Sequence, residues 1–169
     1  MTAPLYAYSV PALKLGLTNL SSLLDKAAAH ADARKLDGKF IADARLIVDM
    51  FPLKRQVQIA CDTAKGAAAR LAGVEMPAYE DNEATIPELK ARIAKTLAFI
   101  DTVRPEQFEG KESQDIVLKF PSITMNFNGL SYLTTFVLPN FYFHVMAAYS
   151  ILRANGVEVG KNDYLGKIQ

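Results

Sequence analysis

Apolar residues recur at spacings of three and four along four long segments of the chain, which is the pattern of amphipathic helices. The first segment runs from about Ser9 to Leu36. We expect Ser9 to cap this helix and Pro11 to lie in its first turn, where a missing N–H costs nothing. Asp37-Gly38 predicts its end. A short helix or an irregular connection is expected over residues 39–48.

The second segment is rich in alanine and opens near Asp49 or Phe51, with Pro52 in its first turn. Small side chains allow a neighbouring helix to approach closely. Gly73 is a typical C-terminal stop, because glycine adopts the left-handed conformation that ends many helices. The apolar stripe of this segment consists of Leu53, Val57, Ala60, Cys61, Ala64, Ala68 and Leu71.

The third segment has the clearest helix start in the chain. A polar connection over residues 74–84 leads to Thr85 and Glu88, which are three residues apart and form a capping box. Ile86, Leu89 and Ile93 begin the apolar stripe that follows. Arg104-Pro105 predicts the end of this helix, because a residue before proline avoids the helical region.

Residues 107–127 change from helical spacing to alternation. Ile116, Leu118 and Phe120 form one alternating run, and a second run starts at Ile123 after Pro121. A period of two predicts strands, so a small β-hairpin or two short extended segments are expected here.

The fourth helical pattern resumes near Gly129 and reaches Asn155, with Gly156 as its stop. Pro139 is expected to kink this helix or divide it, because proline removes a backbone donor inside the helix. The tail, residues 157–169, is expected to lie as a strap over the surface, tied to the rest of the protein by charge pairs.

Four amphipathic segments with one long crossover predict an all-α four-helix bundle, with the small hairpin inserted before the last helix. An α+β domain with a larger hairpin is the alternative. The 169 residues suit a single domain spanning 1–169. The pattern shows no internal repeat and no low-complexity tract.

Composition and charge exclude several classes of function. The net charge is +1 and gives no basic excess for binding nucleic acid. The single cysteine, Cys61, cannot form an intrachain disulfide and fits a reducing compartment. No secretory signal is visible at the N-terminus, and no uncharged apolar run reaches the length of about 18 residues that spans a bilayer. A cytoplasmic protein without membrane contact is therefore expected.

Long strings of residues carry a family resemblance. They are RLIVDMFPLKRQVQIACD at 45–62, RLAGVEMP at 70–77, EATIPELKARI at 83–93, and LPNFYFHVMAAYSILRANGVEVGKNDYLG at 138–166. Together they resemble an uncharacterised domain-of-unknown-function branch of the DinB/YfiT-like superfamily over nearly the whole chain. The resemblance implies a DinB-like bundle with an up-down-down-up layout, and often a homodimer. It implies no assigned activity.

Better-known members of that superfamily hold a divalent metal with three histidines, one from the second helix and two from an H-x-x-x-H pair on the fourth. The resemblance places His144 at the second histidine of that pair. Asn140 stands at the first, and Gln56 is the nearest counterpart on the second helix. The chain has only two histidines, and the other, His30, belongs to a different helix. We therefore expect no three-histidine metal site and no cofactor.

His144 lies near the middle of the apolar stripe of its helix, so its ring nitrogens need partners. Two readings remain open. His144 is a hydrogen-bonded core histidine, or Gln56, Asn140 and His144 form a polar pocket that binds a ligand. No catalytic residue is assigned, since Cys61 on the apolar stripe is expected to behave as a small hydrophobe.

Two functions from different classes follow. The first is a metal-free module that binds a small molecule or a partner protein and forms a homodimer, the latter favoured by the aromatic residues around the last helix. The alternative is an enzyme, either a metal-dependent hydrolase or a thiol-dependent transferase that uses His144.

Overall fold

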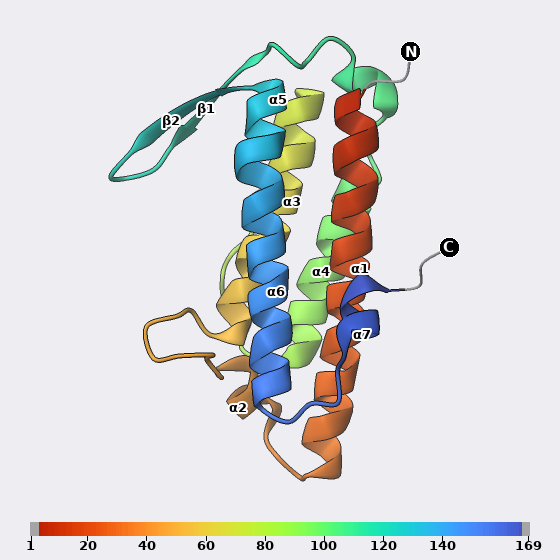
Figure 1. Cartoon of the computed structure of the whole chain (residues 1–169), viewed down its shortest axis with the longest axis vertical. Coiled ribbons are helices and arrows are strands. Elements are labelled where there is room, and N and C mark those ends of the chain that lie inside the picture. The colour runs from red at the N-terminus through yellow and green to blue at the C-terminus, as the bar shows by residue number, and fades with distance from the viewer. Residues whose placement is uncertain (1–3, 167–169) are drawn as a thin grey trace.

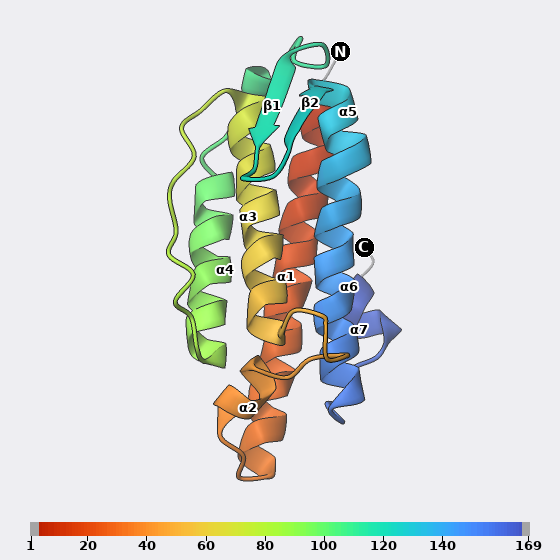
Figure 2. The same cartoon turned by 90° about the vertical axis from the view of Figure 1, so that its left-hand side faces the viewer.

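The computed structural model describes residues 4–166 and contains four long helices in an elongated bundle (Figure 1). These are α1 (Pro4–Ala33), α3 (Leu53–Ala72), α4 (Ile86–Ile100) and α6 (Leu138–Ala154). Helix α3 packs against α4 and α6, and α1 packs against the same two. Figure 2 shows that α1 and α6 run in one direction while α3 and α4 run in the other. This is the up-down-down-up layout expected from the resemblance, and the all-α expectation is confirmed.

The smaller elements lie in the connections between the long helices and, for α7, in the tail after α6. They are α2 (Gly38–Ala42), a 3₁₀ turn at Pro105–Phe108, strands β1 (Asp115–Lys119) and β2 (Thr124–Asn128), the short helix α5 (Gly129–Ser131), a π-helical turn at Tyr132–Val137, and α7 (Lys161–Leu165). β1 and β2 pair antiparallel, with Ile116 opposite Phe127 and Leu118 opposite Met125. The expected small hairpin is thus confirmed, and it projects from one end of the bundle (Figure 1).

The start of α1 differs from the prediction. The helix begins by Pro4, so Ser9 and Pro11 lie inside it, and neither belongs to a first turn. Ser9 is buried, and its hydroxyl donates to the carbonyl of Leu5 one turn earlier. Leu5 itself is 1% exposed. Burial of its side chain stabilises a helical turn on the N-terminal side of Ser9 and Pro11, which are residues that commonly start a helix.

Helix α3 follows its alanine pattern. All members of the predicted stripe are buried, and α3 packs against both α4 and α6. Gly73 adopts a left-handed conformation with φ of 70° and ends the helix, as predicted. At α4 the capping box between Thr85 and Glu88 is formed in both directions.

The last helix changes its hydrogen-bond pattern just before Pro139, without a break. Residues 132–137 form a π-helical turn, and the N–H of Leu138 reaches the carbonyl of Leu133, five residues back. Pro139 has no N–H to bond the carbonyl of Thr135, which loosens the α-helical ladder at this point. The turn aims Tyr132 and Phe136 at the same side of the bundle.

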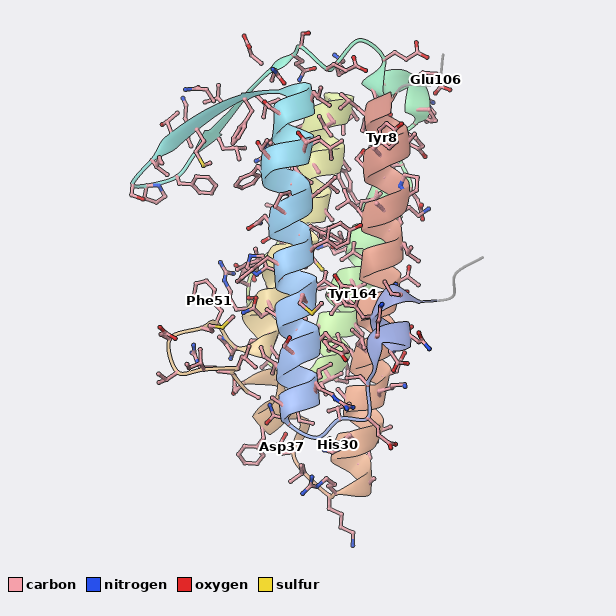
Figure 3. All side chains as sticks on the ribbon, viewed as in Figure 1. Tyr8, His30, Asp37, Phe51, Glu106 and Tyr164 are labelled. Carbon is pink, nitrogen blue, oxygen red and sulfur yellow. The ribbon has the colours of Figure 1, made fainter. Side chains whose placement is uncertain are left out.

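The described part of the tail crosses the bundle as a strap. Asp163 forms an ion pair with Lys26 of α1 at 2.7 Å, and Asn19 of α1 donates to the carbonyl of Tyr164 at 3.0 Å. Figure 3 shows Tyr164 on this strap. The predicted charge pairing is confirmed for residues 157–166, whereas 167–169 lie outside the described residues.

Among residues 4–166, one continuous helix, Gly129–Ala154, is long and apolar enough to cross a membrane by length and composition. It is the fourth helix of the bundle, and 44% of its most apolar stretch is buried in the fold. Core helices of soluble proteins have the same length and composition, so this helix carries no membrane assignment.

Candidate functional site

His144 and Gln56 meet in the interface between α3 and α6. His144 is 7% exposed and Gln56 is 1% exposed. The imidazole Nδ1 lies 2.7 Å from Gln56 Oε1, and Gln56 Nε2 donates to the carbonyl of Phe51 at 3.0 Å. Phe51 belongs to the connection between α2 and α3 at the edge of the bundle (Figure 3). Two of the three candidate residues are therefore in direct contact.

The contact fixes the state of the imidazole. A carbonyl can only accept, so the Gln56 amide nitrogen faces Phe51 and its oxygen faces His144. His144 Nδ1 therefore carries the proton and donates it, and Nε2 keeps its lone pair. Among the described residues the only buried side-chain nitrogen or oxygen without a partner is Arg92 Nε, so His144 Nε2 retains contact with water. Burial and the nearby charge of Arg55 lower the pKa of His144 to about 4, which keeps the ring neutral at pH 7.

Asn140, the third candidate, does not join this pair. It donates to the hydroxyl of Thr63 at 2.8 Å. α3 and α6 are antiparallel, so one turn back along α6 corresponds to a position further along α3. Asn140 and Thr63 instead line a separate groove beside the seam. The expectation of a single polar pocket made by Gln56, Asn140 and His144 therefore needs correction, because the three residues divide between a buried hydrogen-bonded pair and a neighbouring groove.

The groove has a volume of about 650 Å³ and is bounded by four elements. Its floor is the seam between α3 and the last helix, where Thr63 meets Asn140. Leu118 and Phe120 line the groove from the hairpin, and residues 76–79 line it from the crossover between α3 and α4. Apolar and aromatic side chains form most of the walls: Ile59, Met76, Tyr79, Leu118, Phe120, Tyr132 and Phe136. A concave, mainly apolar site with a few polar groups is typical of small-molecule sites.

Three cations line the same groove. Arg55 pairs with Asp81 of the crossover, and Lys65 pairs with Asp62 at 3.0 Å. Arg70 instead donates from Nη1 to the Tyr132 hydroxyl at 3.2 Å. Tyr132 stacks on Phe136 with ring centroids 5.9 Å apart and an interplanar angle of 15°. Arg70 therefore stands beside a stacked aromatic pair.

A charged network beside the groove attaches the crossover to the bundle. The side chain of Arg92 on α4 is 1% exposed and contacts Asp62 and Asp81 at 2.9 Å and Glu83 at 3.0 Å. Gln58 donates to Glu83 at 2.9 Å and is 3% exposed. Periodicity places Gln58 on the outer side of α3, and the crossover covers it there.

Cys61 lies in the interior behind this network and is fully buried. Burial raises the pKa of its thiol to about 12, so it is protonated at pH 7. This agrees with the expectation that Cys61 packs as a small hydrophobe and is not a nucleophile.

Comparisons with known proteins decide the family. The family described as "Domain of unknown function (DUF1993)" matches residues 5–165, which is nearly the whole chain. The chain belongs to the DUF1993 family. A solved structure, the crystal structure of a DinB family member protein from Shewanella denitrificans, superposes with a TM-score of 0.90. It is 41% identical, and the match covers 97% of this chain and 93% of that one.

The solved relative places this DUF1993 chain among the DinB-like proteins, as the resemblance predicted. Among the curated proteins, none matches this chain significantly. The family and the fold are therefore shown, and the activity has to be argued from the site.

The donor set of this DUF1993 protein does not fit the metal of the better-known superfamily members. Zinc sites use three or four imidazole, thiolate or carboxylate ligands. His144 Nε2 is one suitable donor, but the amides of Gln56 and Asn140 already bond His144 and Thr63. Nowhere in residues 4–166 do three His, Cys, Asp or Glu side chains gather as a metal site would require. No chemistry is therefore derived through a metal.

The groove residues of the DUF1993 chain were only partly visible in the sequence. Tyr132 and Phe136 are among the aromatic residues around the last helix that favour a homodimer in the sequence, and the structure places both in the groove wall. Gly66 and Arg70 are four apart on α3, which puts them on one face, and this was the available signal. The groove itself depends on where the hairpin and the crossover pack, which helical periodicity does not determine.

Proposed function

We propose that this protein is a metal-free small-molecule-binding module and that the groove between α3, the last helix, the hairpin and the crossover is its binding site. The observation that carries the proposal is the size and chemistry of this groove. A volume of about 650 Å³ suits a small organic molecule. Its aromatic walls supply contact area, and Asn140 and Arg70 supply polar groups that orient a ligand.

The π-helical turn supports the same site. π-helical turns are uncommon and occur frequently at functional sites. Here the turn presents Tyr132 and Phe136 to the groove as a stacked pair. The least regular part of the last helix is thus also the part that builds the groove wall, which favours ligand binding over a purely structural kink.

The enzymatic alternative has weaker support. A hydrolase or thiol transferase of the superfamily type needs a metal, and the donors at His144 do not fit one. The buried thiol of Cys61 supplies no nucleophile. The homodimer and the cytoplasmic location stay predictions. Exposed Tyr142, Phe143 and Met146 on α6 are apolar surface that a second copy could cover.

A neutral naphthalene dye, N-phenyl-1-naphthylamine, tests the groove directly. The chain contains no tryptophan, so the dye can be excited without protein background. We expect saturable binding to one site. Phe136→Ala should weaken that binding about tenfold, because it removes an aromatic wall. Fluorescence titration gives the dissociation constants.

The matched variants are Phe120→Ala and Phe143→Ala. Phe120 lines the groove and is 47% exposed, whereas Phe143 is 57% exposed on α6 and does not line it. Phe120→Ala should weaken dye binding and Phe143→Ala should not, with little effect of either on thermal stability. Dye binding that is absent, or that Phe143→Ala weakens as much as Phe120→Ala, contradicts the proposal.

Metal content separates the two functions independently. Protein purified without a metal-affinity column is expected to contain divalent metal well below one ion per chain, because His144 has no fellow ligands. Elemental analysis by inductively coupled plasma mass spectrometry measures this. A stoichiometric ion that is lost in His144→Gln would instead support the metal-dependent alternative.

A further inference from the structure

The three cations that line the groove differ in whether they have a carboxylate partner. Arg55 and Lys65 each have a carboxylate partner, in Asp81 and Asp62 respectively. Arg70 has no carboxylate partner within residues 4–166, and its side chain bonds only the neutral Tyr132 hydroxyl. A guanidinium has five N–H donors in a planar fork that matches two oxygens of an anion. The groove therefore offers an uncompensated positive charge at its aromatic end.

Gly66 makes the position of this guanidinium possible. The residue lies inside α3, where glycine costs about 1 kcal/mol relative to alanine. A Cβ at Gly66 would overlap Arg70 Nη1. The absence of a side chain thus lets Arg70 fold back along its own helix toward Tyr132. The position of the Arg70 guanidinium therefore explains why a glycine, which destabilises a helix, occupies position 66.

Tyr132 adds a second donor at the same point. Its hydroxyl accepts from Arg70, and no acceptor for its own O–H is present among the described residues. Burial raises the pKa of Tyr132, so this O–H is retained at neutral pH. The ring is 2% exposed and stacks on Phe136, which fixes where the hydroxyl lies.

We infer that the ligand is a small aromatic acid, whose oxyanion head is bound by Arg70 and Tyr132 and whose ring lies along Phe136 in the groove. This inference rests on the proposed function, since it requires the groove to be the binding site. The other two lining cations are held by carboxylates, so the head is directed to the Arg70 end. The ring then extends over the seam toward Asn140.

Two dyes with one ring system test the charge alone. 1-Anilinonaphthalene-8-sulfonate carries an oxyanion, and N-phenyl-1-naphthylamine is the same skeleton without it. Hydrogen bonds to charged groups predict that the sulfonate binds about 10- to 100-fold more tightly. In Arg70→Gln this preference, the ratio of the two dissociation constants, should fall to near unity. Arg70→Lys should keep only part of the preference for the sulfonate, because an ammonium group cannot bond two oxygens of an anion as a planar guanidinium does.

Gly66→Ala tests the position of the guanidinium with no change in charge. The sulfonate preference should fall because the new methyl displaces Arg70 Nη1, while thermal stability is not reduced, since alanine favours the helix. Arg104→Gln is the control that removes an exposed positive charge outside the groove, and it should leave the preference intact.

The outcomes separate the two levels of the argument. Equal affinity for both dyes in the wild type, or a preference that survives Arg70→Gln, overturns the acid assignment and leaves the groove as a site for neutral ligands. A preference reduced equally by Arg104→Gln overturns it as well, because the attraction is then general. Binding of neither dye overturns the proposed function and the inference together.

Discussion

Replacing Arg92 with alanine is expected to destabilise the fold by about 3 kcal/mol, because its side chain is buried and holds three carboxylates. Glu83 is only 12% exposed and would be left without its cation. Asp62 and Asp81 are more than a third exposed, so water can replace part of what they lose. The expected cost is therefore at the low end of the range for a broken buried pair. Urea unfolding followed by circular dichroism measures it.

Lys90→Ala is the matched control for this prediction. Lys90 also lies on α4, and it pairs with Asp25 at the surface. Exposed pairs contribute less than about 1 kcal/mol, so this variant should unfold near the wild-type urea concentration. If Arg92→Ala costs no more than Lys90→Ala, the network does not hold the crossover to the bundle.

A double-mutant cycle refines the same prediction. Glu83→Gln alone should destabilise, because it removes a partner of Arg92 and of Gln58. In the Arg92→Met background the same change should stabilise, because it removes a buried charge that has lost its cation. A change of sign is the expected signature of coupling between the two side chains. Additive free energies of unfolding would mean that the two act separately.

Local signals in the sequence were sufficient for most of the fold. The capping box of Thr85 and Glu88 is completed within one turn, and Gly73 ends α3 through its own backbone. The alternation that begins at Ile116 predicts a strand, and this strand forms because Ile116 and Leu118 pack against the hydrophobic core. Such features depend on neighbours within a few residues, which a single sequence shows.

Features that depend on distant packing were not predictable. Ser9 has the chemistry of a helix cap, but burial of Leu5 against the bundle carries α1 past it. Gln58 lies on the outer side of α3 by periodicity, and only the path of the crossover buries it. Asn140 bonds Thr63 instead of joining His144, because the pairing along antiparallel helices depends on their relative shift.

The candidate site shows the same division. The contact between Gln56 and His144 was predictable in part, because the resemblance placed both residues at ligand positions of one superfamily site. The groove was not predictable, because its walls come from the hairpin, the crossover and the π-helical turn, which are distant from one another in the sequence. Family membership, which the long matching strings indicated, gave the bundle but no ligand, since function depends on the site and not on the fold.

The second large effect concerns pH. The free energy of unfolding is expected to fall by about 2 kcal/mol as pH decreases from 6.5 to 4, because of His144. Its pKa is lowered from 6.5 to about 4 in the folded protein, chiefly by burial. Between these values the unfolded chain binds the proton and the folded chain does not, so stability increases with pH. The contribution is complete above pH 6.5 and is lost as pH approaches 4. The full pKa shift would predict a larger fall in the free energy of unfolding. The expected fall is smaller because His144 Nε2 retains contact with water, which reduces the effect of burial.

Carboxylates titrate in the same range, so the effect is isolated by comparing variants. His144→Gln keeps a donor for Gln56 Oε1 but does not titrate, and its stability should lack the wild-type fall between pH 6.5 and 4. His30→Gln removes the other histidine and should retain that fall. Parallel curves for wild type and His144→Gln would show that the imidazole is not held neutral.

Gln56→Glu should reverse the sign of this dependence. A carboxylate in place of the Gln56 amide oxygen would stabilise the protonated ring, raising the pKa of His144 above its unfolded value. Stability would then be retained below that value and lost as pH rises through the folded pKa. The reversal would show that the side chain at position 56 acts directly on the imidazole, as the hydrogen bond between Gln56 and His144 indicates. It would also assign the pH dependence to the α3–α6 seam, one turn beyond the groove residue Asn140.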